Sequence, residues 1–291
     1  MLIILVAAAS LSLVGCLVLQ QKTFGSKPKG KRLDRVKASP QFKNGTFENF
    51  SPTPMMAKDA SYFKLIKKYI WKENKTEPDY ILPSVKRNLK LAPSGKPTIT
   101  WFGHSTLLVQ IEGKNILIDP VFSERASPFS FVGSKSYPGT RVYGPSDLPA
   151  IDYLLLSHDH YDHLDYETIM QMKDNVKRFV TPIGVGAHLE YWKVPEQNIS
   201  ELDWWDVIDI SPEIKITAVP ARHFSGRGLL DRNKTLWCSY VLQTKDYKIY
   251  IGGDSGYDTH FKAIGDKFGP FDLAFIECGQ YNAFWPYIHM S

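Results

Sequence analysis

The chain has 291 residues, of which 43% are hydrophobic and 13% are aromatic, a composition that supports a full hydrophobic core and excludes an intrinsically disordered chain. Its formal net charge of +5 is mild, so charge alone identifies neither a nucleic acid nor a membrane as a partner. The three cysteines are an odd number without close spacing, which excludes a disulfide framework.

The N-terminal segment differs from the rest of the chain, because residues 2–19 are almost continuously apolar and approach the ~20 residues that span a bilayer. Residues 13–16 (Leu-Val-Gly-Cys) resemble a bacterial lipobox, although no Lys or Arg precedes the apolar run. The alternative is an uncleaved anchor, whose following lysines would keep the domain cytoplasmic. Both interpretations predict that residues 1–20 attach the protein to a membrane of the bacterial cell envelope. They differ in whether the domain lies on the cytoplasmic or the periplasmic side.

Two segments follow the apolar stretch. Residues 21–60 are rich in Lys, Pro, Gly, Ser and Asn, which predicts a linker or an extended arm. Residues 62–75 repeat lysine at Lys64, Lys68 and Lys72 among apolar side chains, which predicts a basic amphipathic helix. Such a helix either lies on an anionic membrane surface or caps the domain with its lysines in solvent.

The remaining chain predicts one domain, residues 61–291, in which short strands come first and helices are interspersed later. We expect an α/β sandwich of packed layers from this order. Residues 151–157 form a continuous apolar strand, which is typical of a sheet buried on both faces. The predicted strands are 98–102, 107–111, 115–118, 151–157, 214–219, 236–243, 248–251 and 273–277, and the predicted helices are 166–173 and 259–268.

A cluster of polar residues directly follows the buried strand. Three imidazoles and a carboxylate lie within six residues there, which suits zinc because zinc accepts mixed nitrogen and oxygen ligands. These candidate ligands are His158, His160, Asp162 and His163. His223 and Asp254 each follow a later predicted strand, and either residue alone would be a weak signal.

The His-x-His-x-Asp-His loop resembles that of the metallo-β-lactamase superfamily, which folds as an αββα four-layer sandwich and usually binds two metal ions. The resemblance implies that His158, His160 and His223 hold the first zinc ion, that Asp162 and His163 hold the second, and that Asp254 bridges them. Residues 123–128, 201–205 and 268–274 resemble the branch that contains N-acylphosphatidylethanolamine-hydrolysing phospholipase D. This closer resemblance extends from about residue 98 to the end of the chain.

One departure from the family concerns the C-terminus. The family ends with a helix and a strand whose Ile-His-Trp-Gly stretch completes the second metal shell, and this sequence stops at Ser291 without them. The comparison predicts a sandwich without its last helix and strand, which binds the first metal ion well and the second poorly. His289 resembles the histidine before the final helix and is expected to be a catalytic pocket residue rather than a ligand.

The resemblance also implies a mechanism, in which a hydroxide generated at the metal pair attacks phosphorus without a protein nucleophile. Asp162 would ligate the second metal and accept a hydrogen bond from that hydroxide. Asp119 and Asp165 are candidates for orienting the ligand histidines, with turn capping as the alternative. His104, at a strand turn, either reaches the pocket or has a structural role.

These observations predict a zinc-dependent phosphodiesterase of the phospholipase D type, acting on N-acylphosphatidylethanolamine-like phospholipids at a membrane surface. The alternatives are a lactonase or a ribonuclease on the same fold, or a metal-binding scaffold without turnover. A ribonuclease needs a basic groove with stacking aromatic residues. Because no such groove is evident, no nucleic-acid partner is expected, and the oligomeric state is not indicated.

Overall fold

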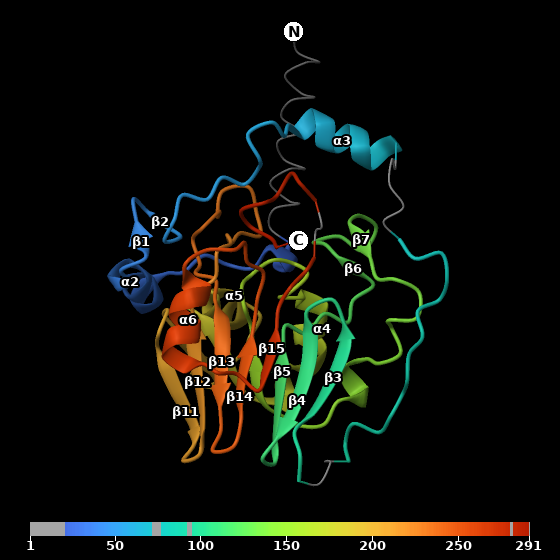
Figure 1. The fold of residues 1–291 in the computed structure, drawn as a ribbon, viewed down its shortest axis with the longest axis vertical. Helices are drawn as coiled ribbons and strands as arrows, with labels where there is room; N and C mark the ends of the chain where they lie inside the picture. Colours follow the sequence, from blue (N-terminus) through green and yellow to red (C-terminus); the bar gives the residue numbers. More distant parts are fainter. Residues whose placement is uncertain (1–20, 72–76, 92–94, 280–281, 291) are drawn as a thin grey trace.

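The computed structural model describes residues 21–71, 77–91, 95–279 and 282–290. Its centre consists of two β-sheets that face each other (Figure 1). The six-stranded sheet has the order β10 (Ile199–Leu202), β9 (Val176–Pro182), β8 (Ile151–Leu155), β5 (Lys114–Ile118), β4 (Thr106–Ile111), β3 (Thr98–Gly103). The five-stranded sheet has the order β11 (Val207–Ser211), β12 (Ile214–Val219), β13 (Ser239–Gln243), β14 (Lys248–Ile251), β15 (Leu273–Phe275).

The main core lies between the two sheets. Side chains alternate along each strand, so Val109 and Ile111 of β4 join this core while Leu108 points to the opposite face of the sheet. Ile216 of β12 and Leu242 of β13 enter the same core from the five-stranded sheet, and both are fully buried. The inward-facing residues of both sheets therefore form one continuous apolar layer.

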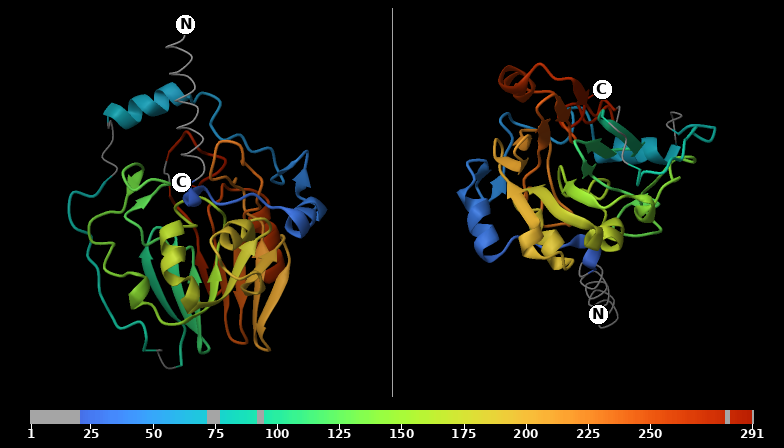
Figure 2. Two further views of the ribbon diagram at one scale, coloured as in Figure 1. Left: turned by 180° about the vertical axis from the view of Figure 1, so that it is seen from behind. Right: turned by 90° about the horizontal axis from the view of Figure 1, so that it is seen from below.

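Helices cover the outer face of each sheet. Ile169 of α4 (Tyr166–Met172) and Leu189 of α5 (Gly186–Tyr191) pack with Leu154 of β8 on the outer side of the six-stranded sheet (Figure 2). Ile264 of α6 (His260–Phe268) packs with Val241 of β13 on the outer side of the five-stranded sheet. The layers are helix, sheet, sheet and helix, so the predicted αββα sandwich is confirmed.

Strand β8 occupies the position that its sequence predicts. It pairs in parallel with both β5 and β9, and Leu154 and Leu155 are buried against different core layers. Strands β9, β10 and β11 and helix α5 were not among the predicted elements. In β9 (Val-Lys-Arg-Phe-Val-Thr-Pro) apolar and polar residues alternate only partly, because the second half of the strand is buried on both sides.

Residues 21–60, predicted to be a linker or an extended arm, are packed against the domain. This segment contains α2 (Gly30–Ala38) and the small hairpin of β1 (Phe42–Lys43) and β2 (Thr46–Phe47). Val36 and Phe47 are fully buried in the core between the sheets, and Arg32 forms an ion pair with Glu201 at 2.8 Å. A few apolar side chains among many lysines therefore dock the segment on the domain.

The predicted basic helix is present as α3 (Tyr62–Trp71), and the rest of its predicted range, 72–75, falls outside the described residues. Phe63, Ile66 and Trp71 are exposed on it. Among the described helices none is long and apolar enough to cross a membrane. The anchor or signal predicted at residues 1–20 lies outside the described part of the chain.

The remaining elements are short and lie in the connections. They are the strand pair β6 (Arg125–Ala126) and β7 (Ser134–Lys135) and the 3₁₀ helices η1 (Lys22–Phe24), η2 (Pro145–Asp147), η3 (Lys173–Asn175) and η4 (Glu196–Asn198).

Candidate metal centre

The candidate ligands lie where strands of both sheets end. His158 follows β8 of the six-stranded sheet, whereas His223 follows β12 and Asp254 follows β14 of the five-stranded sheet. Strands β12 and β14 end at the upper side of the sandwich in Figure 1, and the residues that follow all three strands lie close together. Loops at strand ends can aim neighbouring side chains at one point, so ligands far apart in the sequence converge here.

Three histidines form what we call the imidazole cluster: His158, His160 and His223. His158 Nε2 lies 2.8 Å from His160 Nδ1, and His223 Nε2 lies 3.2 Å from the same atom. A tetrahedral zinc ion with bonds of 2.0–2.1 Å places its nitrogen donors roughly 3.3 Å apart. The facing nitrogens are therefore close to the spacing that one zinc ion requires.

Two of the three histidines of this cluster have a hydrogen-bond partner on the ring nitrogen that faces away from the cluster. His158 Nδ1 lies 2.9 Å from the Ser157 hydroxyl, and His223 Nδ1 donates to the Ile288 carbonyl at 2.9 Å. Such partners fix the ring orientation and the tautomer of a metal-ligating histidine. In His223 the Nδ1 proton leaves Nε2 free to face His160.

A second group, the mixed cluster, consists of Asp162, His163 and Asp254 together with His104. His163 Nε2 lies 3.3 Å from Asp254 Oδ1, and His104 Nε2 lies 3.1 Å from Asp162 Oδ2. His163 Nε2 is buried, and it has no hydrogen-bond partner of good geometry among the described residues. A buried nitrogen that faces a carboxylate without hydrogen-bonding geometry is well placed for a cation between the two.

The electrostatics of both clusters favour a bound cation. Burial, together with the neighbouring imidazoles, holds the pKa of His158 well below its usual value, and burial lowers the pKa of His223 to about 3. These rings are neutral, as metal ligands must be. Burial would also lower the pKa of His163, but Asp254 and Asp119 outweigh it and raise that pKa well above its usual value. The carboxylates that stabilise a proton there would also stabilise a metal ion.

The two aspartates predicted either to orient ligand histidines or to cap turns have different contacts: Asp119 contacts His163, and Asp165 caps helix α4. Asp119 Oδ2 lies 2.9 Å from His163 Nδ1, and the same carboxylate accepts from the Ser157 amide and hydroxyl. Within the described part of the chain, Asp165 forms no hydrogen bond or ion pair with a candidate ligand histidine; its carboxylate accepts from Ser123, Glu167 and Thr168. It caps helix α4 by accepting from the Glu167 amide at 3.2 Å, which is the turn-capping alternative.

Two further histidines lie at the mixed cluster: His104, for which the sequence left a pocket or a structural role open, and His289, which was expected in the pocket. His104 reaches Asp162 although it lies far from the ligand loop in the sequence. His289 Nδ1 lies 3.8 Å from Asp254 Oδ2 and 3.4 Å from Glu277 Oε1. Burial would lower the pKa of His289, but Glu277 and Asp254 outweigh it and raise that pKa.

Two supporting residues were missed by sequence reasoning. The Asn49 side chain accepts from the His223 amide at 3.2 Å and donates to the His223 carbonyl at 2.8 Å. Its separation of 174 residues from His223 leaves no local signal. Glu277 accepts from the Met290 amide at 2.9 Å, and its place at the end of a predicted strand, like Asp254, was a usable signal.

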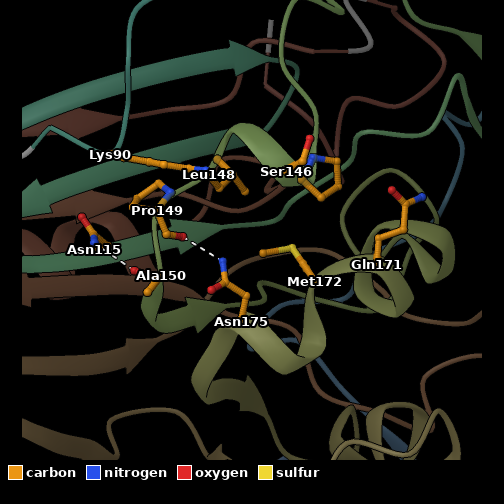
Figure 3. Close-up of a pocket in the computed structure, with 10 residues that line it drawn as sticks. Lys90, Asn115, Ser146, Leu148, Pro149, Ala150, Gln171, Met172 and Asn175 are labelled. Carbon is orange, nitrogen blue, oxygen red and sulfur yellow. Dashed lines mark hydrogen bonds between the residues drawn. The ribbon is translucent and has the colours of Figure 1, made fainter.

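Two cavities lie outside the clusters. One of about 840 Å³ is lined by Asn115, Ala150 and Asn175, among others (Figure 3). Ala150 precedes strand β8 and His158 follows it, so this cavity and the imidazole cluster lie at opposite ends of that strand. The second cavity, of about 550 Å³, is lined in part by Tyr161 and lies against the ligand loop.

A buried imidazole cluster beside a carboxylate-containing cluster, at the strand ends of an αββα sandwich, defines the class of metal-dependent hydrolases. The family profile described as "Beta-lactamase superfamily domain" matches residues 114–291. The chain belongs to this superfamily, and the resemblance predicted from its His-x-His-x-Asp-His loop is confirmed.

Several characterised and uncharacterised proteins are similar to the chain. An uncharacterized protein of Mycobacterium tuberculosis is 40% identical over 262 residues, which cover 87% of this chain and 68% of that protein. N-acyl-phosphatidylethanolamine-hydrolyzing phospholipase D 1 of Caenorhabditis elegans is 37% identical over 198 residues, covering 64% of this chain and 54% of that enzyme. The mitochondrial N-acyl-phosphatidylethanolamine-hydrolyzing phospholipase D of Saccharomyces cerevisiae is 35% identical over 198 residues, which cover 64% of this chain and 40% of that enzyme. The chain thus spans about half or less of these phospholipases.

Proposed function

We propose that the chain is a zinc-dependent phosphodiesterase of the phospholipase D type, which hydrolyses N-acylphosphatidylethanolamine-like phospholipids. The observation that carries the proposal is that Asp254, a member of the mixed cluster, also faces the imidazole cluster. Its carboxylate lies 3.3 Å from His163 Nε2 and 3.8 Å from His223 Nε2, so one residue could serve two adjacent ions. The sequence identity of 37% and 35% to two N-acyl-phosphatidylethanolamine-hydrolyzing phospholipases D supports phospholipids of this class as the substrate.

The donor set fits zinc, which takes imidazole nitrogen and carboxylate oxygen in closely spaced sites. The imidazole cluster would hold one ion and the mixed cluster the other, with Asp254 shared between them. Zinc, when bound, supplies Lewis-acid activation of water and of the phosphoryl group.

The protein's own residues would handle the protons. Asp162 accepts a hydrogen bond from the attacking water and takes its proton, while His104, 3.1 Å away, keeps that carboxylate oriented. His289 Nδ1 lies 3.8 Å from Asp254 Oδ2, at the edge of the same cluster, and we propose that it donates a proton to the alkoxide that leaves phosphorus. The phosphorus–oxygen bond to the ethanolamine side breaks as the water oxygen bonds to phosphorus.

Helix α3 supports a membrane as the source of substrate. Phe63, Ile66 and Trp71 expose 78%, 55% and 66% of their surface on it, and Lys64 and Lys67 are exposed beside them. Exposed aromatic and aliphatic side chains beside lysines suit an anionic lipid surface. We therefore propose a membrane-associated enzyme.

The test is metal analysis combined with a substrate panel, using the whole chain. We expect about two zinc ions per chain and release of N-acylethanolamine from phospholipid vesicles, faster than hydrolysis of a short phosphodiester. Asp162→Asn should abolish turnover, whereas Asp266→Asn, an exposed carboxylate on α6, should not. Turnover of lactones alone would contradict the phosphodiesterase proposal. Zinc binding without any turnover would support a scaffold instead.

A further inference from the structure

Residues 22–26, which we call the strap, contact the side chains that support the loop with the candidate ligands. Their backbone groups meet three side chains of the domain: Lys22 O accepts from Trp192 Nε1 at 2.7 Å, Thr23 O accepts from Arg227 Nη2 at 2.7 Å, and Ser26 N donates to His188 Nδ1 at 3.0 Å. Figure 2 shows the start of the described chain, in blue, beside the outer helices of the six-stranded sheet. The strap thus completes the hydrogen bonding of three largely buried side chains.

Arg227 connects the strap to the ligand loop. It is 3% exposed, and its Nη1 donates to the carbonyls of Asp159 and Leu164, each at 2.7 Å. These two carbonyls stand on either side of the loop segment that contains His160 and His163. Among the described residues no carboxylate forms an ion pair with Arg227. Its buried charge is stabilised by backbone carbonyls, by the faces of the Tyr161 and Trp192 rings, and by the charges of the carboxylates of Asp159, Asp165 and Asp231. Loss of the strap would remove one of those carbonyls.

His188 makes a second connection. Its Nδ1 accepts from the strap, which leaves the proton on Nε2, 3.3 Å from Asp159 Oδ2. Asp159 lies between two ligands of the imidazole cluster in the sequence, and its carboxylate also accepts from Thr235 Oγ1 at 2.8 Å and from the Gly226 amide at 2.7 Å. The orientation of Asp159 is therefore tied to the strap through one imidazole.

Only glycine fits at the centre of the strap. Gly25 has φ of +72°, and a Cβ built on it would lie 2.0 Å from His188 Nδ1. A side chain at this position would both strain the backbone and push the strap away from His188. Gly30 offers a matched comparison, because its φ is +52° and a Cβ there would meet nothing within 4 Å.

We propose that docking of the strap and binding of metal by the ligand loop are coupled, with Arg227 and His188 as the positioning residues that transmit the coupling. The undocked strap leaves the loop carbonyls and Asp159 less restrained, so the imidazole nitrogens spend less time at ligand spacing. Coupling of this kind is reciprocal, and bound metal therefore stabilises the docked strap. The inference rests on the proposed metal binding at this loop, but it does not depend on the substrate.

The first experiment compares Gly25→Ala with Gly30→Ala in the whole chain. Zinc affinity is measured by competition with a chromogenic chelator, and the geometry of the site is followed by the visible spectrum of the cobalt-substituted protein. Gly25→Ala should lower zinc affinity about 10- to 100-fold and alter the cobalt spectrum, in the range found when partners that orient ligands are removed. Gly30→Ala should leave both unchanged. Equal zinc affinity for the two variants would overturn the coupling.

The second experiment measures the reverse effect, that of bound zinc on docking of the strap. Trypsin cleavage after Lys22, identified by mass spectrometry, reports undocking of the strap. Zinc should slow this cleavage in the unaltered chain and in Gly30→Ala, and it should have little effect in Gly25→Ala. Should Gly25→Ala not fold, Arg227→Lys, which keeps the charge but loses the fork of donors, takes its place with the same expectations. An unaltered chain that binds no zinc would contradict the proposed metal centre, whereas zinc binding without protection at Lys22 would contradict only the coupling.

Discussion

The imidazole cluster and the mixed cluster lie side by side, yet they attract a cation in different ways. His158, His160 and His223 are neutral donors already near ligand spacing, and two of them are held by partners on their far nitrogens. In the mixed cluster, His163 is surrounded by carboxylates that raise its pKa, so protons compete with metal there. The imidazole cluster favours a cation through the spacing of its nitrogens, whereas the mixed cluster favours one through the negative charge of its carboxylates.

This difference indicates an order of affinity. Pre-oriented neutral ligands need no deprotonation before they bind, whereas a ring that favours its proton must release it first. We therefore expect the imidazole cluster to hold zinc more tightly than the mixed cluster. The sequence predicted the same order, and in the structure the order follows from the ligand geometry of the imidazole cluster and from the charge around His163.

The largest expected effect comes from His223→Ala, which removes one of only three imidazole donors. We expect zinc affinity of the tighter site to fall by more than about 100-fold, beyond the loss that follows removal of an orienting partner. Turnover should fall to background. Isothermal titration with zinc measures the first effect, and a variant that still binds one ion tightly would contradict the assignment of His223.

Asp162→Asn should have a smaller effect on metal binding, because it alters only the mixed cluster. The expected result is one zinc ion bound with unaltered affinity and a second bound weakly, so elemental analysis after dialysis should fall from about two ions to one. Asp266→Asn, on the outer helix α6, is the control and should retain the full content. Loss of both ions from Asp162→Asn would mean that the clusters are not separable.

The convergence of the candidate ligands could be predicted from sequence, because His158, His223 and Asp254 each follow an apolar strand. The strands predicted at 214–219 and 248–251 agree with β12 and β14, and their ends place His223 and Asp254 at the same side of the sandwich. The run at 151–157 likewise places His158 just beyond β8. A strand that is buried on both faces is a continuous apolar run, which is easy to recognise in a sequence. Because strands of one sheet lie side by side, the residues that follow them come close together.

The supporting contacts could not be predicted in the same way. Asn49 and the strap lie in a stretch whose lysines, prolines and glycines favour a linker or an extended arm, but their contacts join residues 162 or more positions apart. Arg227 lies in a glycine-rich loop, where a charged residue is ordinarily exposed. Only the folded arrangement of carbonyls around it accounts for its burial.

The third prediction concerns Asp119, which orients His163 from behind. In Asp119→Asn, the amide nitrogen cannot accept the His163 Nδ1 proton, so the ring loses the tautomer that presents a free Nε2. Zinc at the mixed cluster should bind about 10- to 100-fold more weakly, with the imidazole cluster little affected. Because Asp119 is 1% exposed, a lost hydrogen bond should also cost about 1–3 kcal/mol of unfolding free energy. Chemical denaturation with and without zinc separates these two effects.

The smallest expected effect is that of Asn49→Ala, which acts on the backbone of His223 rather than on its ring. The variant removes hydrogen bonds to the His223 amide and carbonyl, each of which contributes about 1 kcal/mol. Asn175→Ala is the matched control, because the Asn175 side chain also bonds a carbonyl, that of Pro149, at the opposite end of the sandwich (Figure 3). Both variants should be less stable, but only Asn49→Ala should weaken zinc binding, by less than about 10-fold because the His223 ring keeps its bond to Ile288. Equal zinc affinities for the two variants would mean that the imidazole cluster keeps its geometry without Asn49, and that its ring partners alone suffice to organise it.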